Sequence, residues 1–106
     1  MSRTASPGDY QLQVEGVGSF TFARRKMRDE FAIASEYSRL LDGVPHPTDF
    51  LHFYARAFST VKVLQVSGPA EFDVEELDPQ EDASFAQLMG IFTALRAKEA
   101  DFRLKP

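Results

Sequence analysis

Residues 10–43 read YQLQVEGVGSFTFARRKMRDEFAIASEYSRLLDG, and the spacing of the apolar residues changes within this stretch. From Tyr10 to Val14, and again over residues 19–22, apolar and polar residues alternate. Alternation of this kind is typical of half-buried strands. Between the two runs lies Gly16-Val17-Gly18, and glycine supplies the positive φ angles of tight turns. The stretch therefore predicts a β-hairpin, which must pack on another element because a lone hairpin is marginally stable.

Beyond the hairpin the apolar residues recur about every 3.6 positions, which predicts a helix over about 25–42. Gly43 stands where a helix commonly ends in a left-handed residue, and Pro45 and Pro47 prevent continuation. One face of this helix carries Met27, Phe31, Ala34, Tyr37 and Leu41, and it is widened by Ile33, Leu40 and Val44.

A second helix is predicted to start at Thr48 or Asp49, because either side chain can accept hydrogen bonds from the first-turn amides. We expect it to run to about Val66 and to stop at Gly68 and Pro69. The β-branched residues of 61–66 leave a strand there as the alternative.

A third helix is predicted over about 83–102, with cations near its C-terminus that match the helix dipole. Before it, Asp73 and Glu76 have the spacing of a capping box, which indicates a single helical turn, and Asp78-Pro79 is an expected break. The apolar stripe of the third helix comprises Phe85, Leu88, Phe92, Leu95 and Phe102.

The totals fit one domain of 106 residues, of which 43% are hydrophobic and ten are phenylalanine. We expect a disordered arm over 1–8 and a single globular domain over 9–106 with an α+β, mainly α fold. In this fold the N-terminal β-hairpin packs on about three amphipathic helices. The absence of cysteine excludes disulfides and thiolate metal sites. No secretory signal or apolar run of about 20 residues is found, so the expected location is the cytoplasm.

The charge is unevenly distributed around a net value of −4. Arg24, Arg25, Lys26 and Arg28 form a basic knot at the start of the first predicted helix, where positive charge is unfavourable. No Lys or Arg occurs between Lys62 and Arg96. The knot could neutralise this acidic stretch, within one molecule or between subunits, or it could grip phosphates. The acidic stretch holds Glu71, Asp73, Glu75, Glu76, Asp78, Glu81 and Asp82.

The sequence offers no catalytic signature. His46-x-x-Asp49-x-x-His52 spaces three possible metal ligands evenly, but it lacks the HExxH pattern and is better explained by a loop histidine, a capping aspartate and a surface histidine. Neither a G-x-S-x-G turn nor a phosphate-binding glycine loop is present. We therefore predict a protein that is not an enzyme and that uses no cofactor or metal.

Apolar helix faces are the remaining candidates for function. The aromatic residues Phe50, Phe53, Tyr54 and Phe58 are most simply core, yet they span more than one narrow helical face. An uncovered remainder would mark an oligomer or partner interface. We predict that these four aromatic residues bind a partner and that Arg24, Arg25, Lys26 and Arg28 set its orientation.

The order of segments resembles that of a known family. The segments are VEGVGSFTFARRKMRDEFAIASEYSRLLDGV (14–44), PTDFLHFYARAFSTVKVLQVSGP (47–69), FDVEELDP (72–79) and LRAKE (95–99). Together they resemble small tail assembly chaperones of long-tailed bacteriophages and prophages. The resemblance implies a helical, self-associating, cofactor-free protein that binds the tape-measure protein or tail-tube subunits in the bacterial host cytoplasm.

Two alternatives stay open at this point. The chain could be a structural tail or connector subunit that remains in the virion. It could also be a small nucleic-acid-binding regulator that uses the basic knot, although a net charge of −4 argues against nucleic acid as the partner. No membrane role is expected.

Overall fold

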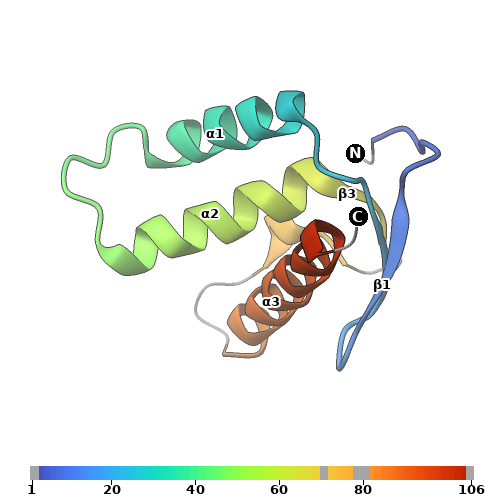
Figure 1. Cartoon of the computed structure of the whole chain (residues 1–106). Coiled ribbons are helices and arrows are strands. Elements are labelled where there is room, and N and C mark those ends of the chain that lie inside the picture. The colour runs from blue at the N-terminus through green and yellow to red at the C-terminus, as the bar shows by residue number, and fades with distance from the viewer. Residues whose placement is uncertain (1–2, 70–71, 78–81, 105–106) are drawn as a thin grey trace.

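The computed structural model describes residues 3–69, 72–77 and 82–104, and it has the predicted α+β, mainly α fold (Figure 1). The chain order begins with the hairpin and ends with the longest helix. The elements are β1 (Tyr10–Val14), β2 (Gly18–Phe22), α1 (Met27–Leu41), α2 (Asp49–Leu64), β3 (Gln65–Ser67), the 3-10 turn η1 (Val74–Glu76) and α3 (Asp82–Leu104).

The predicted hairpin is confirmed in its register and its turn. β1 and β2 pair antiparallel, with Tyr10 opposite Phe22 and Leu12 opposite Phe20. Gly16 and Gly18 have φ angles of 79° and 141°, which residues with a Cβ atom rarely adopt. Leu12 and Phe20 are buried and the intervening Gln11 is exposed, so the alternation sets one face of the hairpin against the helices.

The C-terminal end of α2 differs from the prediction. The helix stops at Leu64, not at Val66, and residues 65–67 form a third strand, which resolves the alternative left open for 61–66. β3 extends the sheet to the order β1-β2-β3, with Thr21 opposite Ser67. The helix ends here because β2 still offers an unpaired edge, and the Ala23 amide donates to the Leu64 carbonyl at 2.8 Å.

The core lies where the inner face of the sheet meets α2 and α3. Phe20 and Phe22 stack with ring centroids 5.6 Å apart, and α3 packs on β1 as well as on α2. Figure 1 shows α3 crossing below α2 beside the strands. The largest fully buried apolar side chains are Phe20, Phe22, Val61, Leu64, Leu88, Ile91 and Leu95.

The predicted caps are largely confirmed. The Thr48 hydroxyl accepts a hydrogen bond from the Leu51 amide at 3.1 Å, so Thr48 and not Asp49 caps α2. The Asp73 carboxylate accepts from the Glu75 amide at 3.0 Å and starts η1. Gly43 has the left-handed φ of 84° expected after α1. The predicted break at Asp78-Pro79 lies outside the described residues.

The face that α1 buries differs from the face that its sequence favours. Met27 and Phe31 are 71% and 70% exposed, whereas Ile33 is buried. The reason is that α1 packs chiefly against one neighbour, α2, as the antiparallel pair in Figure 1. A single neighbour covers only a narrow strip of a helix, and the strip around Ile33 is the one that faces α2.

A chain of ion pairs ties α1 to α2 and to η1. Lys62 Nζ donates to Glu36 Oε1 and to Glu75 Oε1, both at 3.1 Å, and Glu36 also accepts from Arg39. The hydrogen bond from Arg39, followed by that from Lys62, outweighs the opposing effect of burial and lowers the pKa of Glu36 to about 2. Glu36 therefore stays ionised in the folded protein at pH values well below the ordinary pKa of a glutamate.

This shift predicts an acid-labile contribution to stability. A carboxyl group with a lowered pKa in the folded state stabilises the fold above its unfolded pKa, and that contribution is lost as pH falls toward about 2. The unsubstituted protein should therefore lose unfolding free energy as the pH falls from about 4.5 to about 2. In Glu36→Gln this loss should be smaller by roughly 1 kcal/mol. Urea titrations at several pH values measure it, with the exposed hairpin variant Glu15→Gln as control. If Glu36→Gln lost as much unfolding free energy at acid pH as the unsubstituted protein, the ion pairs assigned to Glu36 would be contradicted.

Candidate functional site

The four aromatic residues predicted to bind a partner differ in how far their side chains are exposed. Tyr54 and Phe58 are half-buried and pack against the core. Phe50 and Phe53 are 52% and 48% exposed, and the neighbouring Leu51 is also exposed. We call Phe50, Leu51 and Phe53 the apolar ledge of α2.

The apolar ledge is held in place by aromatic contacts with α3. The Phe50 ring lies 5.4 Å from that of Phe85 and 5.7 Å from that of Tyr54. Phe53 meets Phe92 edge to face at 5.8 Å. Because one side of each ring is fixed by such contacts, the exposed sides form a preorganised apolar surface.

The basic knot divides in a similar way. Arg24 places its guanidinium 4.1 Å from the centroid of the Phe102 ring, on α3. Arg25 donates two hydrogen bonds to Glu99, at 2.9 and 3.0 Å, and one to Glu30 at 2.7 Å. Lys26 and Arg28 are exposed and do not line the cavity described next.

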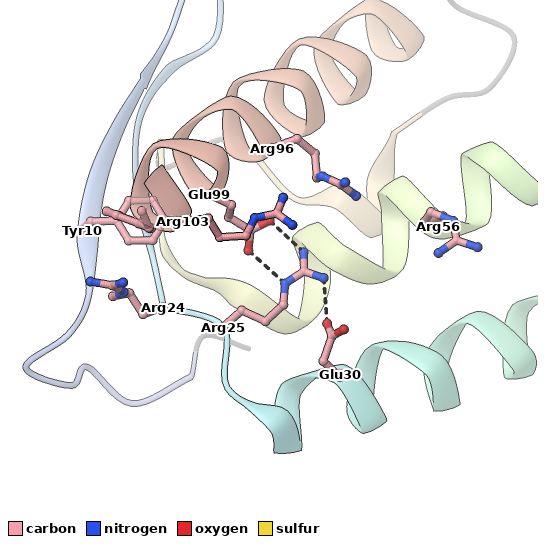
Figure 2. A pocket seen from close by; sticks show the side chains of 9 residues that line it. Tyr10, Arg24, Arg25, Glu30, Arg56, Arg96, Glu99 and Arg103 are labelled. Atoms are coloured by element: carbon pink, nitrogen blue, oxygen red, sulfur yellow. Dashed lines mark hydrogen bonds and ion pairs between the residues drawn. The ribbon is translucent and has the colours of Figure 1, made fainter. Parts of the chain in front are cut away.

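A cavity of about 440 Å³ opens where the start of α1 and the end of α3 approach β1 and α2. Figure 2 shows the side chains around it, with Arg25 between Glu99 and Glu30. We call it the arginine cavity. Its lining residues are Tyr10, Arg24, Arg25, Glu30, Arg56, Arg96, Glu99, Phe102 and Arg103.

The arginine cavity carries an excess of positive charge. It has five arginines and two glutamates, and Arg25 is bonded to both glutamates. Burial works against the charged form of Arg25, yet the hydrogen bonds to Glu30 and Glu99 outweigh it and raise the pKa of Arg25. Within the described part of the chain, the other four arginines form no ion pair. These four are Arg24, Arg56, Arg96 and Arg103.

Tyr10 adds an unsatisfied donor to the same wall. Its hydroxyl group is buried and has no hydrogen-bond partner among the described residues. Burial, followed by the charge of Glu99, raises the pKa of Tyr10, so the hydroxyl keeps its proton. A buried hydroxyl without a partner is costly, and here it lies beside the arginines.

The arginine cavity continues toward α1 and toward the apolar ledge. A second hollow of about 240 Å³ shares Arg25, Glu30, Arg56 and Arg96 with it and extends along α1 to Tyr37. On the other side the Arg96 guanidinium lies 5.9 Å from the ring of Phe92, which itself contacts Phe53. The charged and apolar parts of the surface are therefore neighbours.

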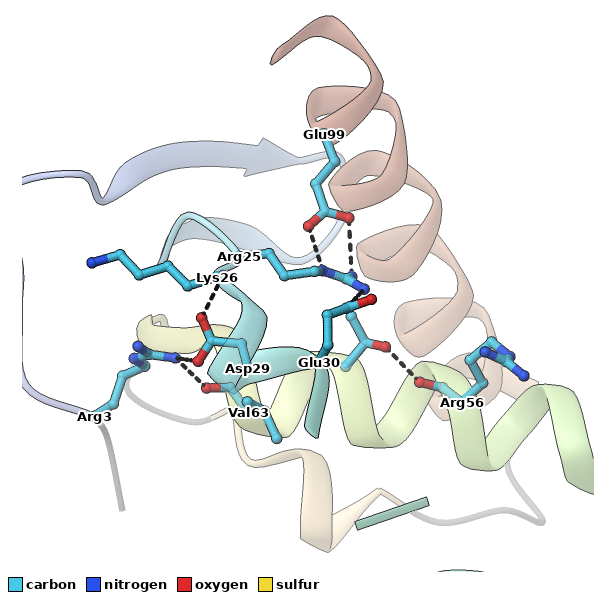
Figure 3. Close-up of polar contacts among 9 residues, drawn as sticks. Arg3, Arg25, Lys26, Asp29, Glu30, Arg56, Val63 and Glu99 are labelled. Carbon is cyan, nitrogen blue, oxygen red and sulfur yellow. Dashed lines mark hydrogen bonds and ion pairs between the residues drawn. The ribbon is translucent and has the colours of Figure 1, made fainter. Parts of the chain in front are cut away.

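The start of α1 is fixed by a polar clamp that Figure 3 shows. Arg3 donates to Asp29 Oδ1 and to the Val63 carbonyl, both at 3.0 Å. The buried Asp29 also accepts from the Lys26 amide at 2.9 Å, so it caps the helix and offsets the unfavourable cations there. Arg3 belongs to the arm predicted over 1–8, of which residues 1–2 lie outside the described part.

Among the described residues, the basic knot forms no ion pair with the acidic stretch. Arg25 pairs with Glu99 and Glu30, because the chain turns from β2 into α1 beside the last turns of α3. Glu75 of the acidic stretch pairs with Lys62 instead. The suggestion that the knot neutralises this stretch within one molecule is therefore wrong for Arg25.

The two histidines line neither the arginine cavity nor the hollow beside it. His52 Nδ1 is hydrogen-bonded to the Tyr37 hydroxyl, and His46 is exposed in the loop before α2. Among residues 3–69, 72–77 and 82–104, no three His, Asp or Glu side chains are grouped so that they could hold a metal ion. No helix in the described part is both long and apolar enough to span a bilayer.

No protein-family model matches the chain, and neither a curated protein nor a solved structure does.

The site predicted from the sequence did not include Tyr10, Arg56, Arg96, Glu99 and Arg103. Arg96, Glu99 and Arg103 have the i, i+3, i+7 spacing of one helical face, which is a signal that could have grouped them. Arg56 is the one charged residue between Phe50 and Val61 of α2, and it too stands out from its apolar neighbours.

Proposed function

We propose that this protein acts by binding an amphipathic helix of a protein partner and that it catalyses no reaction. The observation that carries this proposal is the apolar ledge, whose two phenylalanines are about half exposed yet held by neighbouring rings. Exposed aromatic side chains in a preorganised patch are typical anchors of protein interfaces.

The nature of the partner follows from the family resemblance. We propose a tail assembly chaperone of a long-tailed phage or prophage, acting in the host cytoplasm on the tape-measure protein or on tail-tube subunits. Partner helices of this kind would lay their apolar face on Phe50 and Phe53. Met27 and Phe31 offer a second exposed apolar surface on α1, which is available for self-association.

Removing the anchors should abolish partner capture. We expect Phe50→Ser/Phe53→Ser to weaken binding of helical segments of the tape-measure protein about 1,000-fold, because two interface anchors of roughly 2 kcal/mol each are lost. Affinity capture from cells that co-express the tape-measure protein, followed by calorimetry with the captured segment, measures this effect.

The matched control removes two large exposed apolar side chains from α1, where Met27 and Phe31 are more exposed than the two phenylalanines of the ledge. Met27→Ser/Phe31→Ser should bind the same segment about as well as the unsubstituted protein. Equal losses in both variants, or capture that survives without Phe50 and Phe53, would contradict a binding site on the ledge. Mass spectrometry of purified phage particles separates a chaperone, which is absent from the virion, from a structural subunit, which is present.

A further inference from the structure

We propose that the arginine cavity binds carboxylate groups of an acidic segment in a partner protein. This inference rests on the proposed function only in taking the partner to be a protein. It adds a second point of recognition beside the apolar ledge, and it specifies the chemistry of the residues that occupy it.

The arrangement of charge around the arginine cavity favours an anionic ligand. Four guanidinium groups without an acidic partner in the described part of the chain surround one hollow, in a protein whose net charge is −4. Gathering like charges is unfavourable unless an anion offsets them. The planar fork of arginine matches the two oxygens of a carboxylate, so a carboxylate can take two parallel hydrogen bonds from it.

The unsatisfied hydroxyl of Tyr10 is a further hydrogen-bond donor at this cavity. It keeps its proton, lies on the same wall as Arg24 and Arg103, and has no partner among the described residues. The hydroxyl has almost no accessible surface, so a carboxylate oxygen in the cavity would accept its hydrogen bond once the side chains around it move apart. The cost of burying this donor would then be offset on binding.

The shape and the neighbours of the cavity favour an acidic peptide over nucleic acid. Lys26 and Arg28 lie outside the cavity, so its positive charge does not continue into the track of cations that a phosphate backbone needs. A bounded hollow of about 440 Å³ suits individual side chains. Through Phe92 and Arg96 it adjoins Phe53, so one amphipathic helix with an acidic end could reach both.

The test uses three probes of equal length labelled with fluorescein: hexaglutamate, hexaglutamine and hexathymidylate. Fluorescence anisotropy at low ionic strength should show that the full chain binds hexaglutamate more tightly than either other probe. We expect Arg56→Gln/Arg96→Gln to weaken hexaglutamate binding roughly 10- to 100-fold, because charge-assisted hydrogen bonds are lost. Tyr10→Phe should weaken it several-fold while the ring and its packing remain.

The matched control removes two positive charges outside the cavity. Lys26→Gln/Arg28→Gln should leave hexaglutamate binding within about threefold of the unsubstituted protein, since only the long-range charge changes. Circular dichroism establishes that each variant is folded. Equal losses in the control and the cavity variant would overturn the proposal, because binding would then follow net charge alone. Failure of hexaglutamate to bind, equal binding of hexaglutamine, or tighter binding of hexathymidylate would overturn it as well.

The carboxylate site and the apolar ledge should respond to different substitutions. Hexaglutamate has no apolar side chain, so Phe50→Ser/Phe53→Ser should leave its binding unchanged. If hexaglutamate does not bind but partner capture still depends on Phe50 and Phe53, only the carboxylate site is overturned. If hexaglutamate binding depends on Arg56 and Arg96 but no tail protein is captured, the proposed partner is overturned and the carboxylate site stands.

Discussion

Phe22→Ala is expected to lower the free energy of unfolding by about 3–5 kcal/mol. Phe22 has no exposed surface, stacks on Phe20 and stands opposite Tyr10 in the sheet. Alanine would leave a void where β2, β3 and the helices meet, and the surrounding side chains can close it only in part. Domains of this size are stable by roughly 5–15 kcal/mol, so a large share of the stability would be lost. Urea denaturation followed by circular dichroism measures it.

The control for this prediction is the same substitution at an exposed ring. Phe31 is 70% exposed on α1, so Phe31→Ala should change the unfolding free energy by no more than about 0.5 kcal/mol. Similar losses at Phe22 and Phe31 would contradict the assignment of the core to the sheet side of the protein.

Arg25→Leu is expected to cost about 2–3 kcal/mol of unfolding free energy. Arg25 joins the segment between β2 and α1 to the last turns of α3 through two hydrogen bonds to Glu99. The Glu99 side chain is only 14% exposed, so without Arg25 a largely buried carboxylate would lose its main counter-charge. Equilibrium urea unfolding at neutral pH measures the loss.

A double-mutant cycle identifies the origin of this loss. Arg25→Leu/Glu99→Leu should be more stable than Arg25→Leu alone, because it removes the unpaired carboxylate together with its partner. Arg28→Leu, which removes an exposed cation of the same knot, should cost little. Strict additivity of the two single substitutions would contradict a coupled pair.

Local patterns in the sequence predicted most of the secondary structure. The alternation around Leu12 and Phe20 fixed the hairpin, and the turn and cap residues placed the helix boundaries within a few positions. β3 could not be predicted with certainty, because residues 65–67 become a strand only when the edge of β2 is available to them. Periodicity also misjudged Met27 and Phe31, since it reports that a helix has an apolar face but not whether a neighbour covers it.

The candidate site was predictable in one half and not in the other. The apolar ledge came from a run of aromatic residues within one helix, which a local pattern can detect. The arginine cavity joins Arg25 to Arg56 and Arg96, which are far apart in the chain, and only the tertiary fold brings them together. The Arg25–Glu99 pair spans 74 positions and gives no local signal.

The walls of the arginine cavity are drawn from β1, the β2–α1 connection, α2 and α3. An unfolded or partly assembled chain therefore contains no such hollow. An anion held there would bind the native state alone and would shift the folding equilibrium of the whole domain by mass action. Saturation at about 100 times the dissociation constant would add roughly 2.7 kcal/mol to the folded state. Partner binding and folding would then be linked equilibria, and the bound protein would resist unfolding better than the free protein.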